Sequence, residues 1–404
     1  MNHIEKLLHT LAPKGVEFRK LGEVCDFQKG KSITKKAVTF GKVPVISGGR
    51  QPAYYHNEAN RSGETIAISS SGVYAGYVSY WNIPVFLADS FSVSPKQKTL
   101  MPKYLFHYLT TQQDAIHATK STGGIPHVYS KDLQNFLIPI PPLEIQQEIV
   151  KILDAFTELN TELNTELKAR KKQYEYYQNM LLDFNDINQN HKDAKMSAKT
   201  YPKRLKTLLQ TLAPKGVEFR KLGEVCEILD NRRIPIAKNK RNPGIYPYYG
   251  ANGIQDYIDN YIFDGDFVLV GEDGSVINKD NTPVVNWASG KIWVNNHAHV
   301  LQTKNELKLR FLYFYLQTID VSYCVAGTPP KINQENLKKI TIPIPPLEIQ
   351  QEIVKILDQF SILTTDLLAG IPAEIKARKK QYEYYREKLL TFKPLTPHKE
   401  VEKC

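Results

Sequence analysis

The chain has 404 residues, and its basic residues outnumber its acidic ones to give a formal net charge of +11. This length provides for roughly two to four domains with hydrophobic cores of their own, so the fold needs no disulfide or metal support. Four cysteines are too few for a disulfide-rich scaffold, and no apolar run is long enough to cross a membrane. The positive charge favours a polyanionic partner, and together these features predict a cytoplasmic protein.

The sequence consists of two copies of one repeat in tandem. Three segments of the first copy return letter for letter in the second, while the stretches between them differ. Such a duplication predicts two similar folds. Because identical frames enclose different interiors, we expect the two copies to bind different things. The identical pairs are residues 11–25 with 212–226, 138–154 with 342–358, and 168–177 with 376–385.

Each copy is expected to begin with a short amphipathic helix, because apolar residues recur three and four positions apart over residues 4–11 and 205–212. A globular stretch follows, in which short β-type runs are separated by Gly, Asn, Asp and Pro. Helical periodicity near the end of each stretch makes both domains mixed α/β rather than all-β. These helices are expected over residues 102–112 and 307–318.

A long helix follows each globular stretch. The prolines of the I-P-I-P-P run fix φ and remove backbone donors, so the first helix can start only at about Pro142. Beyond it, apolar residues alternate four and three positions apart, a heptad pattern typical of helices that pack on each other. Two amphipathic helices in one large core are the alternative. The predicted seam consists of Ile145, Ile149, Ile152, Phe156, Leu159 and Leu163, and of Ile349, Ile353, Ile356, Phe360, Leu363 and Leu367.

The chain is therefore predicted to fold as two mixed α/β (α+β) domains joined by two long helices, with pseudo-two-fold symmetry from the tandem duplication. A polar segment without apolar periodicity separates the copies and indicates a linker. The predicted parts are residues 1–137 for a short helix and the first domain, 138–182 for the first long helix, 183–200 for the linker, 201–340 for the second short helix and domain, 341–392 for the second long helix, and 393–404 for a tail.

Motifs for catalysis are absent from the sequence: it has no phosphate-binding loop, dinucleotide turn, zinc-protease motif or nucleophile elbow. His297 and His299 alternate along a predicted strand, which provides two metal ligands, but a site needs at least a third. Glu272 and Asp273 fit a turn, or an acceptor for a cytosine amino group, better than a catalytic pair. We expect neither a catalytic residue nor a bound metal in this chain.

Basic and polar residues cluster in the loops of both domains. Lysine and arginine can neutralise phosphates, and aromatic and amide side chains can reach base edges. An ordinary solvated face, or core packing for the tyrosines, is the alternative for any single residue. The DNA-binding candidates are Lys29, Lys31, Lys35, Lys36, Arg50, Gln51 and Tyr74 in the first domain, and Arg232, Arg233, Lys238, Lys240, Arg241, Tyr249 and Asn252 in the second.

The three doubled segments, in this order over nearly the whole chain, resemble the specificity subunit of bacterial type I restriction-modification systems. The resemblance implies two target-recognition domains that each read one half of a split site in double-stranded DNA. It implies that the two long helices form an antiparallel coiled coil, which docks two modification (methyltransferase) subunits and, through them, restriction or motor subunits. The cofactors S-adenosylmethionine, ATP and Mg would belong to those partners, and no cofactor is expected here.

The resemblance also implies DNA-facing loops before each proline segment. These loops cover residues 121–127 and 327–333, and they add four candidates for DNA contact. The added candidates are Ser121, His127, Lys331 and Asn333.

One feature distinguishes the two long helices. The first carries a T-E-L-N repeat over residues 157–167, whereas the second is interrupted by a Gly/Pro segment at 369–375. In the resembled family, similar repeats vary in copy number and alter the spacing between half-sites. Ordinary heptad filler is the alternative interpretation.

Two other functions stay open at this point. A self-contained DNA methyltransferase with unfamiliar motifs would transfer methyl groups without partners. A coiled-coil scaffold that binds no DNA would show no salt-dependent association with a duplex.

Overall fold

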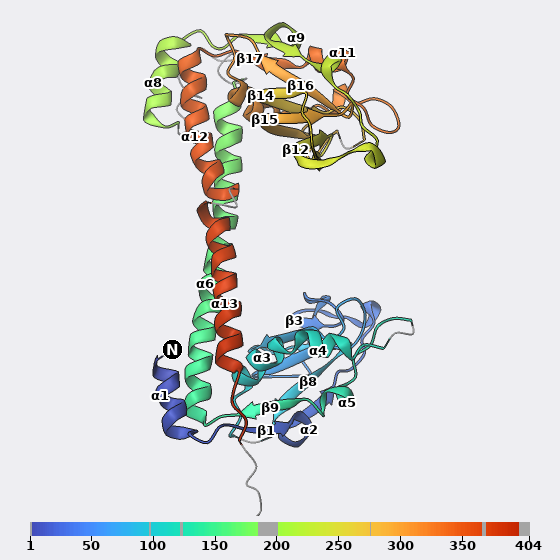
Figure 1. Cartoon of the computed structure of the whole chain (residues 1–404), viewed down its shortest axis with the longest axis vertical. Helices are drawn as coiled ribbons and strands as arrows, with labels where there is room; N and C mark the ends of the chain where they lie inside the picture. The colour runs from blue at the N-terminus through green and yellow to red at the C-terminus, as the bar shows by residue number, and fades with distance from the viewer. Residues whose placement is uncertain are drawn as a thin grey trace, which may run out of the picture. The chain divides into compact units, whose positions relative to one another are not determined.

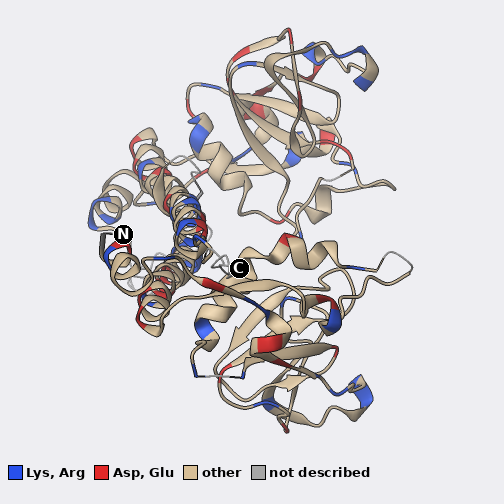
Figure 2. Ribbon diagram, turned by 60° about the horizontal axis from the view of Figure 1, so that its bottom comes forward, with Lys and Arg blue, Asp and Glu red and all other residues tan. Residues whose placement is uncertain are grey.

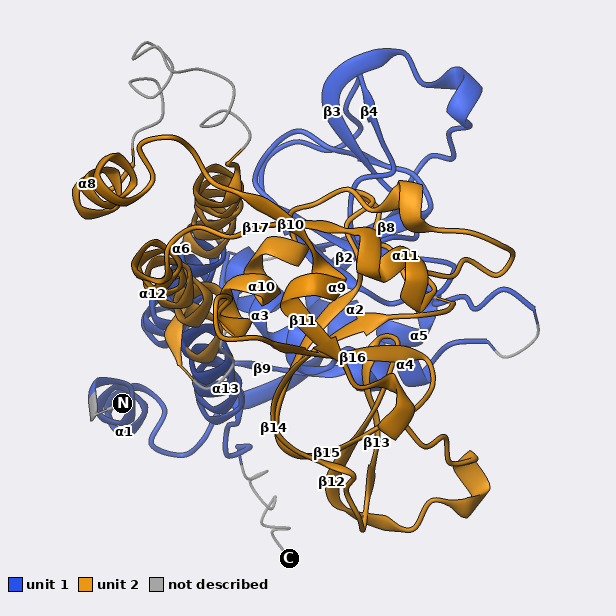
Figure 3. Cartoon of the chain, turned by 90° about the horizontal axis from the view of Figure 1, so that it is seen from above, with its two compact units in different colours: residues 1–164, 374–404 blue, residues 165–373 orange. Residues whose placement is uncertain are grey.

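The computed structural model describes residues 2–96, 98–121, 124–184, 201–274, 276–365 and 369–395. The chain divides into two compact units (Figure 3). Unit 1 comprises Met1–Asn164 with Glu374–Cys404, and unit 2 comprises Thr165–Ala373. The predicted linker lies outside the described residues from position 185 to its end. No described helix combines the length and the apolar character that a membrane crossing requires.

Unit 1 contains one mixed α/β domain, as predicted. Its strands are β1 (Glu17–Lys20), β2 (Cys25–Lys29), β3 (Phe40–Ile46), β4 (Tyr54–His56), β5 (Thr65–Ser69), β6 (Val78–Trp81), β7 (Phe86–Leu87), β8 (Ser90–Pro95) and β9 (Leu137–Ile140). Its shorter helices are α1 (Asn2–Leu11), α2 (Leu21–Val24), η1 (Lys35–Ala37), α3 (Pro102–Thr111), α4 (Gln113–Ala118) and α5 (Ser130–Leu133). The sheets have the orders β2-β8-β5-β6, β4-β3-β7 and β1-β9.

Unit 2 contains the second domain. Its strands are β10 (Phe219–Lys221), β11 (Cys226–Ile228), β12 (Pro243–Gly250), β13 (Gly253–Ile258), β14 (Phe263–Gly271), β15 (Val285–Val294), β16 (Ala298–Thr303) and β17 (Thr341–Pro343). Its shorter helices are α8 (Lys203–Leu212), α9 (Leu222–Val225), η2 (Asp230–Arg232), η3 (Lys238–Lys240), α10 (Leu309–Leu316), η4 (Ser322–Cys324) and α11 (Gln334–Lys339). The sheets have the orders β11-β16-β14-β15-β12-β13 and β10-β17.

The two domains share one strand register. In unit 1, Ile66 of the central strand β5 lies opposite Val93 of β8, and in unit 2 Val268 of β14 lies opposite Leu301 of β16. All of β5 is buried, which shows that side chains cover both faces of this strand. The matched register allows positions in the two domains to be compared one by one.

The long helices are α6 (Leu143–Leu182), α12 (Leu347–Thr365) and α13 (Gly370–Leu390) (Figure 1). α6 begins one residue after the predicted start. The predicted Gly/Pro break separates α12 from α13. Gly370 has a φ of +73°, which residues with a side chain rarely adopt, and Pro372 lies in the first turn of α13, where its missing N–H costs nothing.

The predicted seam residues pack against both the globular domains and the neighbouring long helices. Ile145 and Ile149 are fully buried in a cluster that contains both Leu105 of the first domain and Leu389 of α13. Leu153 is also fully buried there, although the heptad pattern did not include it. In unit 2, Ile349 and Ile353 are fully buried as well. The other seam residues that the structure describes are half-buried, and Leu367 lies outside the described residues.

Each domain is closed by the tyrosine segment of the other repeat. In unit 1, Phe156 of α6 stacks on Tyr385 of α13, with ring centroids 5.5 Å apart. In unit 2, Tyr177 of α6 stacks on Phe360 of α12 at 5.2 Å. The start of α6 thus meets the end of α13, so these helices run antiparallel (Figure 1). Downstream residues enter the cores: Leu389, Leu390 and Phe392 in unit 1, and Leu181, Leu182 and Phe184 in unit 2.

A buried glutamine in each proline segment explains part of its identity. The Gln146 side chain donates to the carbonyls of Pro141 (2.7 Å) and Thr99 (2.8 Å) and accepts from the Met101 N–H (2.9 Å). Gln350 makes the equivalent bonds with Pro345, Glu306 and Lys308. In each unit the glutamine therefore joins two backbone segments, the proline segment and the loop before α3 or α10.

Candidate nucleic-acid interface

In both units the central strand ends against the loop that precedes a short helix, and the same backbone contacts form there. Isolated β-bridges join Ser71 to His127 in unit 1 and Asp273 to Lys331 in unit 2. The glycine after each bridge has a positive φ, +84° at Gly72 and +78° at Gly274. The matched N–H···O bonds are Ser70 to Asp89 (3.0 Å), Val128 to Ser70 (2.9 Å) and Gly72 to Pro126 (3.0 Å), and Glu272 to His297 (2.9 Å), Ile332 to Glu272 (2.9 Å) and Gly274 to Pro330 (3.1 Å).

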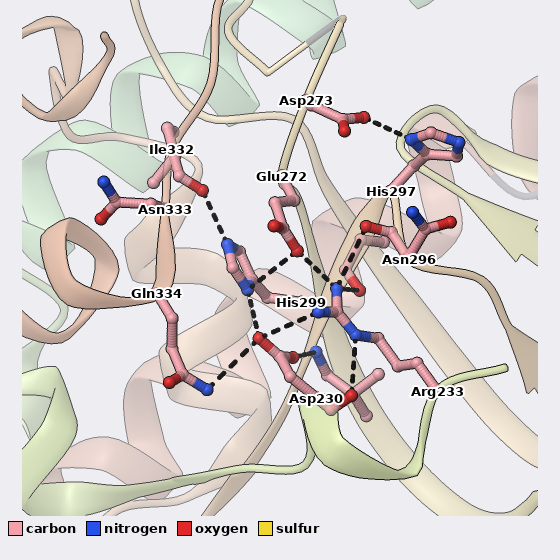
Figure 4. Close-up of polar contacts among 12 residues, drawn as sticks. Asp230, Arg233, Glu272, Asp273, Asn296, His297, His299, Ile332, Asn333 and Gln334 are labelled. Carbon is pink, nitrogen blue, oxygen red and sulfur yellow. Dashed lines mark hydrogen bonds and ion pairs between the residues drawn. The ribbon is translucent and has the colours of Figure 1, made fainter. Parts of the chain in front are cut away.

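Beneath this junction, unit 2 contains a network of ionic side chains (Figure 4). The Arg233 guanidinium lies 2.6 Å from the Glu272 carboxylate and 3.4 Å from that of Asp230. It also donates to the carbonyl of Ala298 at 2.8 Å. The Lys331 ammonium lies 3.0 Å from the other oxygen of Glu272. The charges of two carboxylates are thereby balanced by two cations, as partial burial requires.

His299 is fully buried at the centre of this network. Its Nδ1 lies 2.6 Å from the Asp230 carboxylate and its Nε2 lies 2.8 Å from the carbonyl oxygen of Ile332. The two ring nitrogens therefore contact the Asp230 carboxylate on one side and the Ile332 backbone on the other. His299 thus joins strand β16 to η2 and to the loop before α11.

The Asp230 carboxylate has a pKa below its ordinary value. Burial alone would raise this pKa, but the hydrogen bond from His299, the nearby Arg233 charge and the Val300 N–H outweigh burial. Asp230 is therefore held in its charged form by the network.

Asp230, Glu272 and His299 also form a group that could hold a cation. Their carboxylates are already paired with Arg233 and Lys331, so side-chain cations take the place of a metal. The two histidines considered as a ligand pair do not converge, because His297 bonds Asp273 instead (Figure 4). His297 lies just before β16 rather than in it. The donor set therefore fits an internal ion-pair network better than a metal centre.

The equivalent junction in unit 1 carries different side chains. The Ser71 hydroxyl donates to the Asp89 carboxylate, and His127 stacks on Tyr129 with ring centroids 5.9 Å apart. The position equivalent to His299 is occupied by Phe91, which is buried against Phe27. Unit 1 thus supports its junction with apolar packing, whereas unit 2 uses ion pairs.

Several candidates from the sequence gather around the unit 1 junction. The Arg50 guanidinium lies over the rings of Tyr74 (4.9 Å) and Tyr77 (5.6 Å). The Ser121 N–H donates to the carbonyl of His127. The exposed candidates of unit 1 are Lys29, Lys31, Lys35, Lys36, Arg50, Gln51 and Tyr74, and the half-buried ones are Ser121 and His127.

The candidates of unit 2 divide into exposed and internally bonded side chains. Arg233 is 12% exposed and paired as described. Arg241 pairs with Asp256 and stacks on Tyr248. Tyr249 is 8% exposed and packs in a hydrophobic cluster. The exposed candidates are Arg232, Lys238, Lys240, Asn252, Lys331 and Asn333.

Three of the candidates in unit 2, Asn333, Arg233 and Tyr249, are engaged within the domain. Asn333 caps α11 by accepting from the Asn336 N–H, so its oxygen already has a partner. Arg233 and Tyr249 contribute to the stability of the domain, and their roles in DNA contact stay predictions. Ser71 and Asp89 were not predicted from the sequence. Their place at the junction becomes visible only when the two repeats are aligned through the strand register.

Charge is distributed differently over the helices and the domains. Figure 2 shows acidic and basic residues interleaved along the long helices, whereas basic residues lie on exposed turns of both domains. The basic turns η1 and η3, with Lys35, Lys36, Lys238 and Lys240, are exposed. Such turns can contact phosphates without disturbing a core.

A family model described as the type I restriction modification DNA specificity domain matches residues 13–172 and 214–377. The chain belongs to this family. Both matched regions run from the start of a domain into a long helix, so each repeat is one copy of the specificity module. The prediction of a non-catalytic specificity subunit that recognises DNA sequence is confirmed, and the methyltransferase and scaffold alternatives are not favoured.

Relatives of this specificity subunit differ in the share of the chain they match. A type I restriction enzyme specificity subunit of Haemophilus influenzae is 45% identical over 179 residues, which cover 43% of this chain and 46% of that protein. A type I specificity subunit of Mycoplasma pneumoniae is 34% identical over 262 residues, 63% of this chain and 95% of that protein. An Escherichia coli type I restriction enzyme specificity subunit is 26% identical over 451 residues, 98% of each chain.

The fold of this specificity subunit also occurs in a solved structure. The S subunit of a type I restriction-modification system from M. genitalium superimposes with a TM-score of 0.64 at 19% identity, covering 93% of this chain and 96% of that one. This similarity confirms the predicted fold class of two mixed α/β domains with long helices.

Proposed function

We propose that this specificity subunit reads a bipartite site in double-stranded DNA, with one half-site for each unit. Its long helices dock two modification subunits and, through them, restriction or motor subunits. S-adenosylmethionine, ATP and Mg serve those partners, and this chain holds no cofactor. The complex acts in the cytoplasm.

The proposal of two half-sites is supported by the matched junctions at the ends of β5 and β14. The same bridges and backbone bonds position Ser71 and His127 in unit 1, and Asp273 and Lys331 in unit 2. A shared backbone with different exposed chemistry is the arrangement expected of two readers that follow one docking geometry and distinguish different bases.

The identical exposed residues support the proposal of two docked subunits. Glu144, Gln147 and Lys151 on α6 are not fully buried in any core, and Glu348, Gln351 and Lys355 on α12 repeat them without change. Packing within the chain does not demand identity at exposed positions. Two equal surfaces are what two copies of one partner require.

A domain exchange tests the half-site assignment. Residues 227–340 are replaced by the corresponding domain of another specificity subunit, and the methylated motifs are mapped across the genome of cells that express the complex. The expected result is a new sequence in one half of the motif and an unchanged sequence in the other half.

The matched control replaces residues 26–137 instead and is expected to change only the other half. Changes in both halves after either replacement would contradict the assignment of one half-site to each unit. A methylated motif that stays unchanged in both halves after both replacements would contradict DNA reading by these domains.

A further inference from the structure

The two junctions differ at a small set of equivalent positions. The hydrogen-bond register makes Ser71 equivalent to Asp273, and His127 equivalent to Lys331, because each pair forms the same bridge. Asp89 is equivalent to His297, because each carbonyl accepts the N–H at the end of the central strand. No two of these equivalent residues are alike, although the backbone that holds them is the same.

These side chains are accessible. His297 and Lys331 are 47% and 46% exposed, and Asp273 is partly exposed beside them. In unit 1, Asp89 is exposed and Tyr129, which stacks on His127, is 48% exposed. Core packing therefore does not determine which residue occupies these positions.

The side chains are also held in place. Asp273 is bonded to His297, and Lys331 is bonded to Glu272, whose carboxylate is in turn fixed by Arg233. In unit 1 the Ser71 hydroxyl bonds Asp89. Fixed polar groups on a strand end discriminate between bases better than mobile ones, because their rotamers are settled before binding.

Each held group keeps hydrogen-bonding capacity. A carboxylate accepts at two oxygens and an ammonium has three N–H groups, so the internal bonds of Asp273 and Lys331 leave acceptors and donors unused. Donors of the lysine type suit O6 and N7 of guanine, and an acceptor suits the N4 amino group of cytosine. The pair on the bridge of unit 2 thus matches the two edges of a G·C base pair.

We propose that Asp273, His297 and Lys331 in unit 2, and Ser71, Asp89 and His127 in unit 1, are the specificity-determining side chains of the two domains. The unit 2 set reads a G·C pair through Lys331 and Asp273, with His297 as the positioning residue for the carboxylate. This proposal rests on the proposed function, in which each unit reads one half-site.

The test exchanges the unit 2 set for that of unit 1, with the triple substitution Asp273→Ser, His297→Asp and Lys331→His in the full chain. The complex with the modification subunits selects binding sites from a pool of duplexes with randomised positions. The expected result is a roughly ten- to hundred-fold change in base preference at one or two positions of one half-site, and none in the other half.

A second variant covers the case in which the triple exchange does not fold. Asp273→Asn keeps the shape of the side chain and turns one acceptor into a donor, so preference for the G·C pair should fall about tenfold or more. Asp264→Asn is the matched control, because Asp264 is an exposed carboxylate near the other end of the same strand, β14.

The unmodified complex separates the two proposals. If it selects no bipartite motif, the proposed function fails. If it selects a bipartite motif that Asp273→Asn leaves unchanged, or changes no more than Asp264→Asn does, the half-site assignment stands and the specificity-determining set is overturned. A change confined to the half-site of unit 1 would overturn the set as well.

Discussion

At the scale of single residues, the buried charges of unit 2 stabilise the domain as a group. Arg233, Asp230 and Glu272 are each largely buried, and the guanidinium bonds both carboxylates. Removing one member of such a group leaves an uncompensated buried charge, which costs more than the net contribution of the pair. The sequence could not distinguish Arg233 from a phosphate-binding arginine, because its partner Glu272 is 39 positions away.

Arg233→Met is expected to lower the free energy of unfolding of unit 2 by about 3 kcal/mol, since it leaves two carboxylates with less compensation. Arg232→Met is the matched control, because Arg232 is exposed and contacts the Phe263 ring, and it should cost less than about 1 kcal/mol. Urea denaturation followed by circular dichroism measures both. Equal losses would contradict the distinction between the two arginines.

A buried histidine in unit 1 should make this unit less stable at low pH. His107 is 2% exposed, its Nε2 lies 3.0 Å from the Asp154 carboxylate, and its Nδ1 finds no partner among the described residues. Burial lowers the His107 pKa, and the hydrogen bond with Asp154 offsets only part of this effect. Below about pH 6.5, His107 is therefore protonated in the unfolded chain but still neutral in the native state. Unit 1 consequently loses stability as the pH falls.

The substitution His107→Phe removes this titration and introduces the residue that unit 2 has at the equivalent position, Phe314. Met101 and Lys308 bond matching glutamines, and they lie six positions before His107 and Phe314 respectively. His107 and Phe314 are therefore equivalent. The decrease in melting temperature between pH 7.5 and pH 5.5 should become smaller in the variant. An unchanged decrease would show that His107 does not carry the pH dependence.

At the scale of elements, periodicity and proline placement predicted the helices well, because both depend on local backbone chemistry. α6, the break before α13, and the helices α3 and α10 lie where the sequence indicated. The residues that pack against a helix face, in contrast, come from distant parts of the sequence. The 4/3 spacing indicated that Ile145 is buried, but not that domain residues and the end of α13 meet around it.

Gln146→Leu tests the glutamine anchor. It removes three buried hydrogen bonds to backbone groups of Pro141, Thr99 and Met101, so unit 1 should lose about 3 kcal/mol or more of unfolding free energy. Gln147→Leu changes the neighbouring exposed glutamine in the same way and should change stability by less than about 0.5 kcal/mol. Denaturant unfolding compares the two, and similar losses would refute the anchor role.

At the scale of the whole molecule, the candidate interface was only partly predictable. The loops with His127 and Lys331 were expected to face DNA, but Asp89 was not singled out, because only strand pairing brings it to the end of β5. The T-E-L-N run, in contrast, is visible in the sequence. The division between the two units falls inside it, between Asn164 and Thr165.

Deletion of residues 161–164 removes one T-E-L-N repeat and shortens α6 by about 6 Å. The gap between half-sites should decrease by roughly one to two base pairs at about 3.4 Å each, while both half-site sequences persist. Methylation mapping reads the gap and both halves together. An unchanged gap would contradict a spacer role for the repeat.

The exchange of closing segments between the repeats also sets an order in which the chain can fold on the ribosome. Unit 2 uses only residues 165–373, so all its parts exist once the first turn of α13 has been made. Unit 1 needs Leu389, Leu390 and Phe392 in its core, and Val16 pairs with Pro394. Of the two domains, the one that is translated earlier is therefore completed later, because its core stays open until residues 389–394 have been made.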